Sequence, residues 1–154
     1  MRFKKGIILA AGRGTRLSPA TKVIAKPLLP LYDKPLLYYA LSNLINARVR
    51  EVLFISQKQD ISQFKKLFGT GKQFGMKFSY TFQSKQTGIP DAINVGEKFI
   101  GKKPFILALA DNLFIGENFK SALKEVQSIN SGAAVLAVKT KYPSKSAVIE
   151  FDIK

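Results

Sequence analysis

The sequence predicts an α/β fold, a three-layer sandwich in which a mostly parallel sheet lies between layers of helices. Short apolar runs, typical of strands buried on both faces, alternate along the chain with segments of helical periodicity. The length also fits a single domain, because the chain has 154 residues, of which 46% are hydrophobic. Residues 1–154 are therefore interpreted as one domain.

The first third of the chain predicts one strand and one helix, separated by a long connection. Residues 6–11 form an apolar run that ends at glycines, and residues 12–17 are expected to form a loop. Prolines at positions 19, 27, 30 and 35 keep the following stretch extended or turning. A helix fits residues 36–47, with Pro35 in its first turn.

The rest of the chain predicts further strands and helices in alternation. Residues 51–56 are apolar and strand-like, residues 60–68 have helical spacing and end at Gly69, and residues 78–83 alternate aromatic with polar side chains. Further expected elements are a helix over residues 90–99, a strand over 104–110, a helix over 119–129, and strands over 133–138 and 147–151. The last strand ends close to Lys154 with no closing helix, so the domain is expected to be truncated at its C-terminus.

The composition restricts the chemistry that the protein can perform. The chain contains no cysteine and no histidine, which excludes disulfides, thiolate chemistry, histidine metal sites and Ser-His-Asp triads. An enzyme of this composition works by positioning and electrostatics, through a metal held by carboxylates, or through Lys and Arg. No signal peptide or membrane-spanning stretch is recognisable, so a cytoplasmic protein is expected.

The charge is strongly positive, with 25 Lys+Arg against 10 Asp+Glu and a formal net charge of +15. A polyanion such as a nucleic acid is one interpretation. A solvated, lysine-rich surface is the other, and it is favoured because the lysines are scattered as pairs and form no long basic block.

The loop after the first strand is a candidate phosphate-binding site. Gly12 and Gly14 flank Arg13, and Thr15 and Arg16 follow. Glycines let backbone N–H groups approach an anion closely, and an arginine can pair with phosphate oxygens through two hydrogen bonds. The pattern matches neither the dinucleotide fingerprint nor the Walker loop. From the pattern alone, phosphate binding and a simple turn remain equal alternatives.

Three other side chains are candidates for the same site. Asp111 follows a buried strand and is well placed to hold Mg²⁺ together with substrate phosphates, although an Asp-Asn pair can also be only a turn. Lys26, in a segment stiffened by prolines, could reach a phosphate or could be one solvated lysine among many. Gln83 ends the third strand before Gly88, and its amide suits the edge of a uracil or thymine ring, or is simply an exposed polar group.

Taken together, these segments resemble the sugar-1-phosphate nucleotidyltransferases, and within them the thymidylyl-transferring branch. Residues 9–17 read Leu-Ala-Ala-Gly-Arg-Gly-Thr-Arg-Leu, and residues 26–30 read Lys-Pro-Leu-Leu-Pro. Residues 32–35, 38–39, 68–75 and 111–114 also match the pattern of that branch. The resemblance covers the whole chain in one register and implies the N-terminal, nucleotide-binding portion of a Rossmann-like nucleotidyltransferase domain.

The resemblance also implies a reaction and the roles of particular residues. A sugar 1-phosphate, expected to be glucose 1-phosphate, attacks the α-phosphorus of dTTP or UTP and releases pyrophosphate. Arg16 and Lys26 would act as catalytic residues that hold the phosphates, Asp111 would bind Mg²⁺, and Gln83 with the Gly88 backbone would read the pyrimidine. The residues assigned to nucleotide binding are Leu9, Ala10, Ala11, Gly12, Arg13, Gly14, Thr15, Gln83 and Gly88.

The sequence departs from the family pattern in several places. Ala11 and Ala147 stand where relatives have glycine, and the later Glu-Lys-Pro motif and second metal-binding aspartate of the family are absent. Two alternatives therefore stay open: a short homologue that binds nucleotide or a partner without turnover, and a basic nucleic-acid-binding domain. The choice between dTTP and UTP and the identity of the sugar also stay open. Self-association into a homo-oligomer is expected from the apolar surface that the missing segment would cover.

Overall fold

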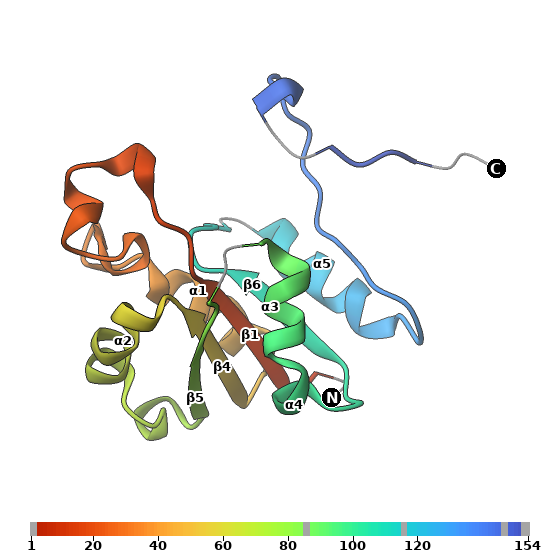
Figure 1. The fold of residues 1–154 in the computed structure, drawn as a ribbon. Coiled ribbons are helices and arrows are strands. Elements are labelled where there is room, and N and C mark those ends of the chain that lie inside the picture. Colours follow the sequence, from red (N-terminus) through yellow and green to blue (C-terminus); the bar gives the residue numbers. More distant parts are fainter. Residues whose placement is uncertain (1–2, 85–86, 115–116, 146–147, 152–154) are drawn as a thin grey trace.

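The sheet at the centre of the molecule is fully parallel (Figure 1). The computed structural model describes residues 3–84, 87–114, 117–145 and 148–151. The sheet consists of β1 (Lys5–Ala10), β4 (Glu51–Ser56), β5 (Lys77–Phe82) and β6 (Phe105–Leu109), in the order β5-β4-β1-β6. This arrangement confirms the predicted α/β fold with a mostly parallel sheet.

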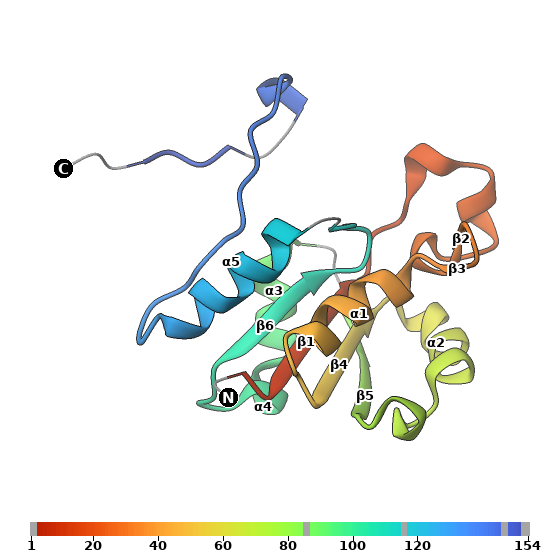
Figure 2. The same ribbon diagram turned by 180° about the vertical axis from the view of Figure 1, so that it is seen from behind.

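Helices cover both faces of the sheet, which confirms the expected three layers (Figures 1 and 2). Alternate side chains of β4 divide the core, because Val52 and Phe54 pack on one side and Leu53 and Ile55 on the other. The first side is covered by α1 (Leu37–Asn46), α2 (Ile61–Phe68) and α5 (Glu117–Ser128), and the second by α3 (Ile89–Val95) and α4 (Glu97–Ile100). Of the helices in the described ranges, none has both the length and the apolar composition that crossing a membrane requires.

An aromatic cluster centred on Phe54 joins α2 to β4 and β5. The Phe54 ring stacks on Phe68 and on Tyr80, with ring centroids 5.3 Å apart in each pair, and contacts Phe64 and Phe78 edge-on. The Tyr80 hydroxyl donates a hydrogen bond of 2.7 Å to the Gly69 carbonyl, and burial raises the pKa of Tyr80 to about 12. These contacts fix the half of the sheet from which residues 57–60 and 83–84 emerge.

The helix predicted over residues 90–99 is broken into α3 and α4 at Gly96. A Cβ atom at this position would lie 2.8 Å from Ile7 Cδ1 on β1, so the absence of a side chain at Gly96 lets the helix pack closely on the sheet. The helical periodicity of the segment gives no sign of this close contact with β1.

The connection between β1 and α1 is more regular than the sequence predicts. It contains short 3₁₀ helices and a two-stranded antiparallel ribbon of β2 (Pro30–Leu31) and β3 (Lys34–Pro35). Pro35 thus belongs to the ribbon and not to the first turn of α1, which is a correction. Among the described residues, the 3₁₀ helices are η1 (Thr15–Leu17), η2 (Ala20–Lys22), η3 (Lys26–Leu28), η4 (Lys58–Asp60), η5 (Lys72–Phe74) and η6 (Pro143–Lys145).

The strands predicted after α5 are wrong in the described residues. Residues 133–138 form no strand, and Val135 and Val138 are 77% and 86% exposed. Residues 148–151 are also outside any strand, whereas residue 147 lies outside the described residues. The segment runs away from the sheet (Figure 1) and therefore has no neighbouring backbone with which to form a ladder.

Candidate functional site

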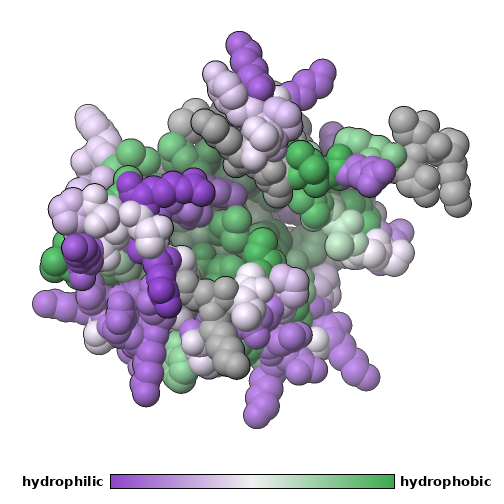
Figure 3. Space-filling view, turned by 45° about the horizontal axis from the view of Figure 1, so that its top comes forward, coloured by the Kyte–Doolittle hydropathy of each residue, from purple (hydrophilic) through white to green (hydrophobic). Residues whose placement is uncertain are grey.

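The strand order creates a crevice at one edge of the sheet. The chain passes from β1 to β4 and β5 on one side of β1, and then returns to β6 on the other side. In open parallel sheets, ligands bind at such a switch point, beyond the carboxyl ends of the strands. A cavity of about 380 Å³ lies there, and Figure 3 shows a depression at this edge with apolar side chains in its floor and hydrophilic ones at its rim. Its lining consists of Leu9, Ala10, Gly12, Gly14, Thr15, Arg16, Leu17, Lys26, Pro27, Leu109, Ala110 and Asp111.

The loop from Gly12 to Leu17 forms one wall of the cavity. Gly14 has φ 63°, and a Cβ atom there would lie 2.9 Å from Lys26 Cβ and from Thr21 Cγ2. The Gly14 carbonyl accepts hydrogen bonds from the Thr21 hydroxyl and from the Leu17 N–H, each 2.9 Å long. A glycine is thus favoured at position 14 for two reasons: its φ is positive, and a side chain there would collide with Lys26 and Thr21. A Cβ atom on Gly12, by contrast, would meet nothing within 4 Å.

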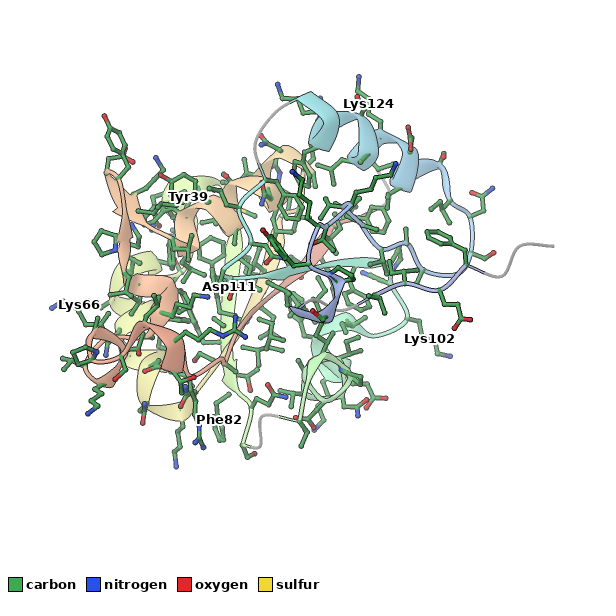
Figure 4. The ribbon with its side chains drawn as sticks, turned by 90° about the horizontal axis from the view of Figure 1, so that it is seen from above. Tyr39, Lys66, Phe82, Lys102, Asp111 and Lys124 are labelled. Atoms are coloured by element: carbon green, nitrogen blue, oxygen red, sulfur yellow. The ribbon has the colours of Figure 1, made fainter. Side chains whose placement is uncertain are left out.

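Lys26 and Asp111 form an ion pair in the cavity wall. The Lys26 Nζ lies 2.7 Å from Asp111 Oδ2, and the side chains are 32% and 42% exposed. Lys26 begins η3, whose Pro27 is buried, and Asp111 follows Ala110, whose N–H donates to the Leu9 carbonyl at 2.9 Å. Both residues are therefore held by backbone elements. Figure 4 looks down on this edge of the sheet and shows Asp111 near the middle of the molecule.

The charges in the cavity wall favour an anion. Arg16 and Lys26 are the cations in the lining, and Asp111 is the carboxylate. Within the described part of the chain, Arg16 forms no ion pair, so its guanidinium is available to a ligand. Two cations against one carboxylate leave a net positive site that could bind phosphate groups through charge-assisted hydrogen bonds.

Gln83 lies in a second, adjoining cavity of about 730 Å³. Its side chain is buried, with 5% of its surface exposed, and its Nε2 donates to the Gly88 carbonyl at 3.1 Å and to Asp91 Oδ2 at 2.6 Å. The structure thus brings Gln83 and Gly88 together, but it does not bring them into the first cavity. The lining of the second cavity consists of Arg13, Gln57, Lys58, Gln59, Phe82, Gln83 and Ser84.

Arg13 connects the two cavities. Its neighbours Gly12 and Gly14 line the first cavity, whereas its own side chain lines the second. Ala11 is buried and lines neither cavity. The contact of Asp91 with Gln83 was not predicted, although a charged residue so soon after Gly88 was a detectable signal. Lys58, whose Nζ lies 5.8 Å from the centre of the Phe82 ring, was also not predicted.

The protein supplies some, but not all, of the oxygen ligands that a hard divalent cation would need near Asp111. No group of three or more metal-ligating side chains occurs in the residues that the structure describes. The Oδ1 atom of Asp111 takes no part in the ion pair with Lys26, so one carboxylate oxygen at the cavity can act as a ligand. Mg²⁺ is commonly bound by one or two carboxylates together with substrate phosphates. The arrangement suits a cation that arrives with a phosphate ligand.

Comparison with known proteins identifies relatives of the whole chain. A family model described as nucleotidyl transferase matches residues 5–154. A glucose-1-phosphate thymidylyltransferase of Neisseria meningitidis is 45% identical over 148 residues, which cover 96% of this chain and 51% of the relative. A protein of the same name from Mycobacterium tuberculosis is 42% identical over 147 residues, with coverages of 96% and 51%. The chain therefore spans about half the length of the curated relatives it matches.

Solved structures have the same fold. A structure from Bacillus anthracis, described as a candidate glucose-1-phosphate thymidylyltransferase, matches with a TM-score of 0.77 and 34% identity, over 83% of this chain and 52% of that protein. A UDP-glucose pyrophosphorylase complexed with UDP-glucose matches with a TM-score of 0.70 and 31% identity, with coverages of 81% and 53%. The parallel sheet and its helices are thus shared with proteins that carry these names.

Proposed function

This chain belongs to the nucleotidyl transferase family, and on that premise we propose that it binds the nucleotide for a sugar-1-phosphate nucleotidyltransferase. The reaction joins dTTP or UTP to a sugar 1-phosphate and releases pyrophosphate. The names of the relatives, glucose-1-phosphate thymidylyltransferase and UDP-glucose pyrophosphorylase, favour a pyrimidine nucleotide and glucose 1-phosphate. Because the chain spans half of these relatives, its own substrates and activity are part of the proposal.

The observation that carries this proposal is the positively charged cavity at the ends of β1 and β6. Arg16 and Lys26 face one carboxylate there, and the glycine loop lies beside them. A triphosphate carries several negative charges, so two cations and the backbone N–H groups of residues 12–15 would bind it. The open space above Gly12 lets a phosphate approach the backbone.

The reaction agrees with a site that lacks histidine and cysteine. An oxygen of the sugar phosphate forms a new bond to the α-phosphorus, and the bond from that phosphorus to the bridging oxygen of pyrophosphate breaks. The attacking oxygen is already an anion, so no side chain has to remove a proton. Catalysis then depends on alignment and on stabilisation of charge, to which Arg16 and Lys26 would contribute by holding the phosphates.

Asp111 would hold Mg²⁺, and the bound metal would neutralise part of the negative charge of the triphosphate. In the structure, Lys26 occupies one oxygen of this carboxylate. A triphosphate offers the Lys26 ammonium another anionic partner and thereby releases Asp111. Nucleotide and metal would therefore be expected to bind in a coupled manner.

Gln83 and the Gly88 backbone would read the base in the second cavity. Arg13 connects this cavity with the phosphate loop, so a nucleotide could place its phosphates in the first cavity and its base in the second. A buried amide discriminates between bases because a mismatched base leaves polar groups unpaired.

Calorimetric titration of the 154-residue chain with UTP and dTTP in the presence of Mg²⁺ tests the proposal. Lys26→Ala is expected to weaken binding, whereas Lys66→Ala removes an equal charge from the periphery and should not (Figure 4). Equal effects of the two variants would contradict a specific phosphate site. Tighter binding of a single-stranded oligonucleotide, unaffected by Lys26→Ala, would instead favour the nucleic-acid-binding alternative.

A further inference from the structure

Asp91 and Gln83 form a short hydrogen bond at the start of α3. The Gln83 Nε2 donates to Asp91 Oδ2 at 2.6 Å and to the Gly88 carbonyl at 3.1 Å. Gln83 is also anchored through its backbone, because its N–H donates to the Ser56 carbonyl at 3.0 Å. Asp91 forms no ion pair with any residue that the structure describes, so Gln83 is the partner that its carboxylate has there.

These contacts fix the orientation of the Gln83 amide group. An ionised carboxylate and a carbonyl oxygen accept hydrogen bonds and cannot donate them. The end of the amide next to Asp91 and Gly88 is therefore the NH₂ group, and both of its protons are used. The Oε1 atom accepts no hydrogen bond from the described residues, and Gln83 lines the second cavity. Gln83 can thus offer a ligand an acceptor, but not a donor.

We propose that Asp91 is a positioning residue that fixes the polarity of Gln83, so that the site accepts uracil or thymine and rejects cytosine. This inference rests on the proposed function, because it assumes that the base of a nucleotide reaches Gln83. It assigns a specificity role to a residue that lies outside the phosphate-binding cavity and one helical turn beyond Gly88.

The complementarity follows from the ring nitrogen N3. In uracil and thymine, N3 carries a proton and donates to an acceptor such as Gln83 Oε1. In cytosine, N3 carries a lone pair, which would face the lone pairs of Oε1. A free glutamine could rotate its amide by 180° and offer the NH₂ group instead. Asp91 and the Gly88 carbonyl both oppose this rotation, because the reversed amide would point Oε1 at two acceptors, and the charged carboxylate at the shorter distance opposes it more strongly. Guanine also has a ring N–H, so this polarity does not separate uracil from guanine.

Substitution of Asp91 by Asn tests the inference, because asparagine has the same shape but can donate as well as accept. In this variant only the Gly88 carbonyl still opposes the reversed Gln83 amide, so the reversed form becomes more accessible. Asp91→Leu provides a second variant, in which the side-chain acceptor is removed and the Gly88 carbonyl remains. Asp33→Asn is the matched control, since it removes an equal charge from an exposed carboxylate that pairs with Lys34 away from both cavities.

The measurement is the ratio of the dissociation constants of CTP and UTP for the 154-residue chain. The original chain is expected to prefer UTP by about tenfold or more, the factor that corresponds to about 1.4 kcal/mol. The ratio should fall to about threefold or less in Asp91→Asn, and should be unchanged in Asp33→Asn. The side-chain amide resonances of Gln83 in NMR spectra give a readout that needs no nucleotide, and both proton shifts should change in Asp91→Leu.

The outcomes separate this inference from the proposed function. If neither Asp91 variant changes the ratio while UTP still binds, Asp91 does not set the polarity and the inference alone is overturned. Equal affinity of the original chain for UTP and CTP overturns it as well. If the chain binds no nucleoside triphosphate at all, the proposed function fails together with the inference.

Discussion

The Lys26 ammonium lies 2.7 Å from the Asp111 carboxylate, which joins two residues that are 85 positions apart in the sequence. Each side chain is at the wall of the same cavity, and each is partly open to solvent. An exposed pair of this kind contributes at most about 1 kcal/mol to stability. It can therefore separate easily when a metal and a phosphate offer both charges better partners.

Asp111→Asn is expected to remove the dependence of nucleotide binding on Mg²⁺. The variant loses the carboxylate that would hold the metal, and it also frees Lys26. Binding of UTP without metal should consequently improve, whereas the further improvement caused by Mg²⁺ should disappear. Titration of UTP at increasing Mg²⁺ concentrations measures both effects. An unchanged metal dependence would show that Asp111 is not a ligand.

Arg16→Ala is expected to weaken binding of UTP more than binding of uridine. Charge-assisted hydrogen bonds of a guanidinium contribute about 1.5–3 kcal/mol, which corresponds to roughly 10- to 100-fold in affinity. Uridine has no phosphate and should bind with the same affinity to both chains. Calorimetry with the two ligands decides the matter, since an equal loss for both would indicate a structural role for Arg16.

Two glycines of the same loop are expected to respond in opposite ways to substitution by alanine. Gly14→Ala should lower the free energy of unfolding by about 1–3 kcal/mol, because φ is positive there and the new methyl group would lie 2.9 Å from Lys26 Cβ. Gly12→Ala should change stability by less than about 0.5 kcal/mol, since its Cβ meets nothing within 4 Å, but should weaken UTP binding. Urea unfolding and calorimetry measure the two quantities. A stable Gly14→Ala variant with unchanged UTP affinity would contradict the first half of this prediction.

Much of the fold was predictable because buried parallel strands are apolar along their whole length. The residues of β1, β4 and β6 stand out for this reason, and alternation shows β5 as clearly. The close packing of Gly96 on Ile7 was not predictable, because it depends on the position of a distant strand. The strand predicted over residues 133–138 was wrong because strand formation requires a neighbouring strand as well as a suitable sequence.

The location of the candidate site could be predicted from the carboxyl ends of the strands. The contacts between its side chains could not. Parallel strands bring their carboxyl ends to one edge, so the glycine loop and Asp111 were expected to be neighbours there. The contact between Lys26 and Asp111 needed the course of the long connection, which no periodicity predicts. The contact between Asp91 and Gln83 was not predictable, because the two residues are 8 positions apart and helix or strand spacing gives no information over that separation.

The chain is expected to prefer pyrimidine to purine triphosphates. The Oε1 atom of Gln83 and the nearby backbone of Gly88 would bind the edge of a single ring. Competition of dTTP, UTP, ATP and GTP for the same site measures the preference. About tenfold or more over ATP is expected from one good polar contact, because adenine has no ring N–H for Gln83 Oε1, whereas GTP is disfavoured by the size of its double ring. Tightest binding of ATP or GTP would refute the assignment of Gln83 to the base.

Asp60→Asn is expected to stabilise the protein at neutral pH. Asp60 ends η4 and precedes α2, and it is buried without a side-chain hydrogen bond to the start of that helix. Burial raises the pKa of the Asp60 carboxyl above its ordinary value of 3.8, because the charged form loses contact with water. The folded state therefore holds this proton more tightly than the unfolded state does. The contribution of this tighter proton binding to the free energy of unfolding is fully present below pH 3.8. It is lost as the pH rises through the higher pKa of the folded state.

Asparagine carries no charge at any of these pH values, so the gain from Asp60→Asn should be present at pH 7 and shrink as the pH falls toward 3.8. A gain of up to about 1 kcal/mol in the free energy of unfolding is expected at pH 7. Asp33→Asn is the control, since the Lys34 side chain lowers the pKa of that exposed carboxyl and its replacement should give no gain. Urea unfolding of the three chains at pH 4.5 and pH 7 measures the difference. A gain of equal size at both pH values would show that the effect comes from packing or helix capping and not from the buried charge.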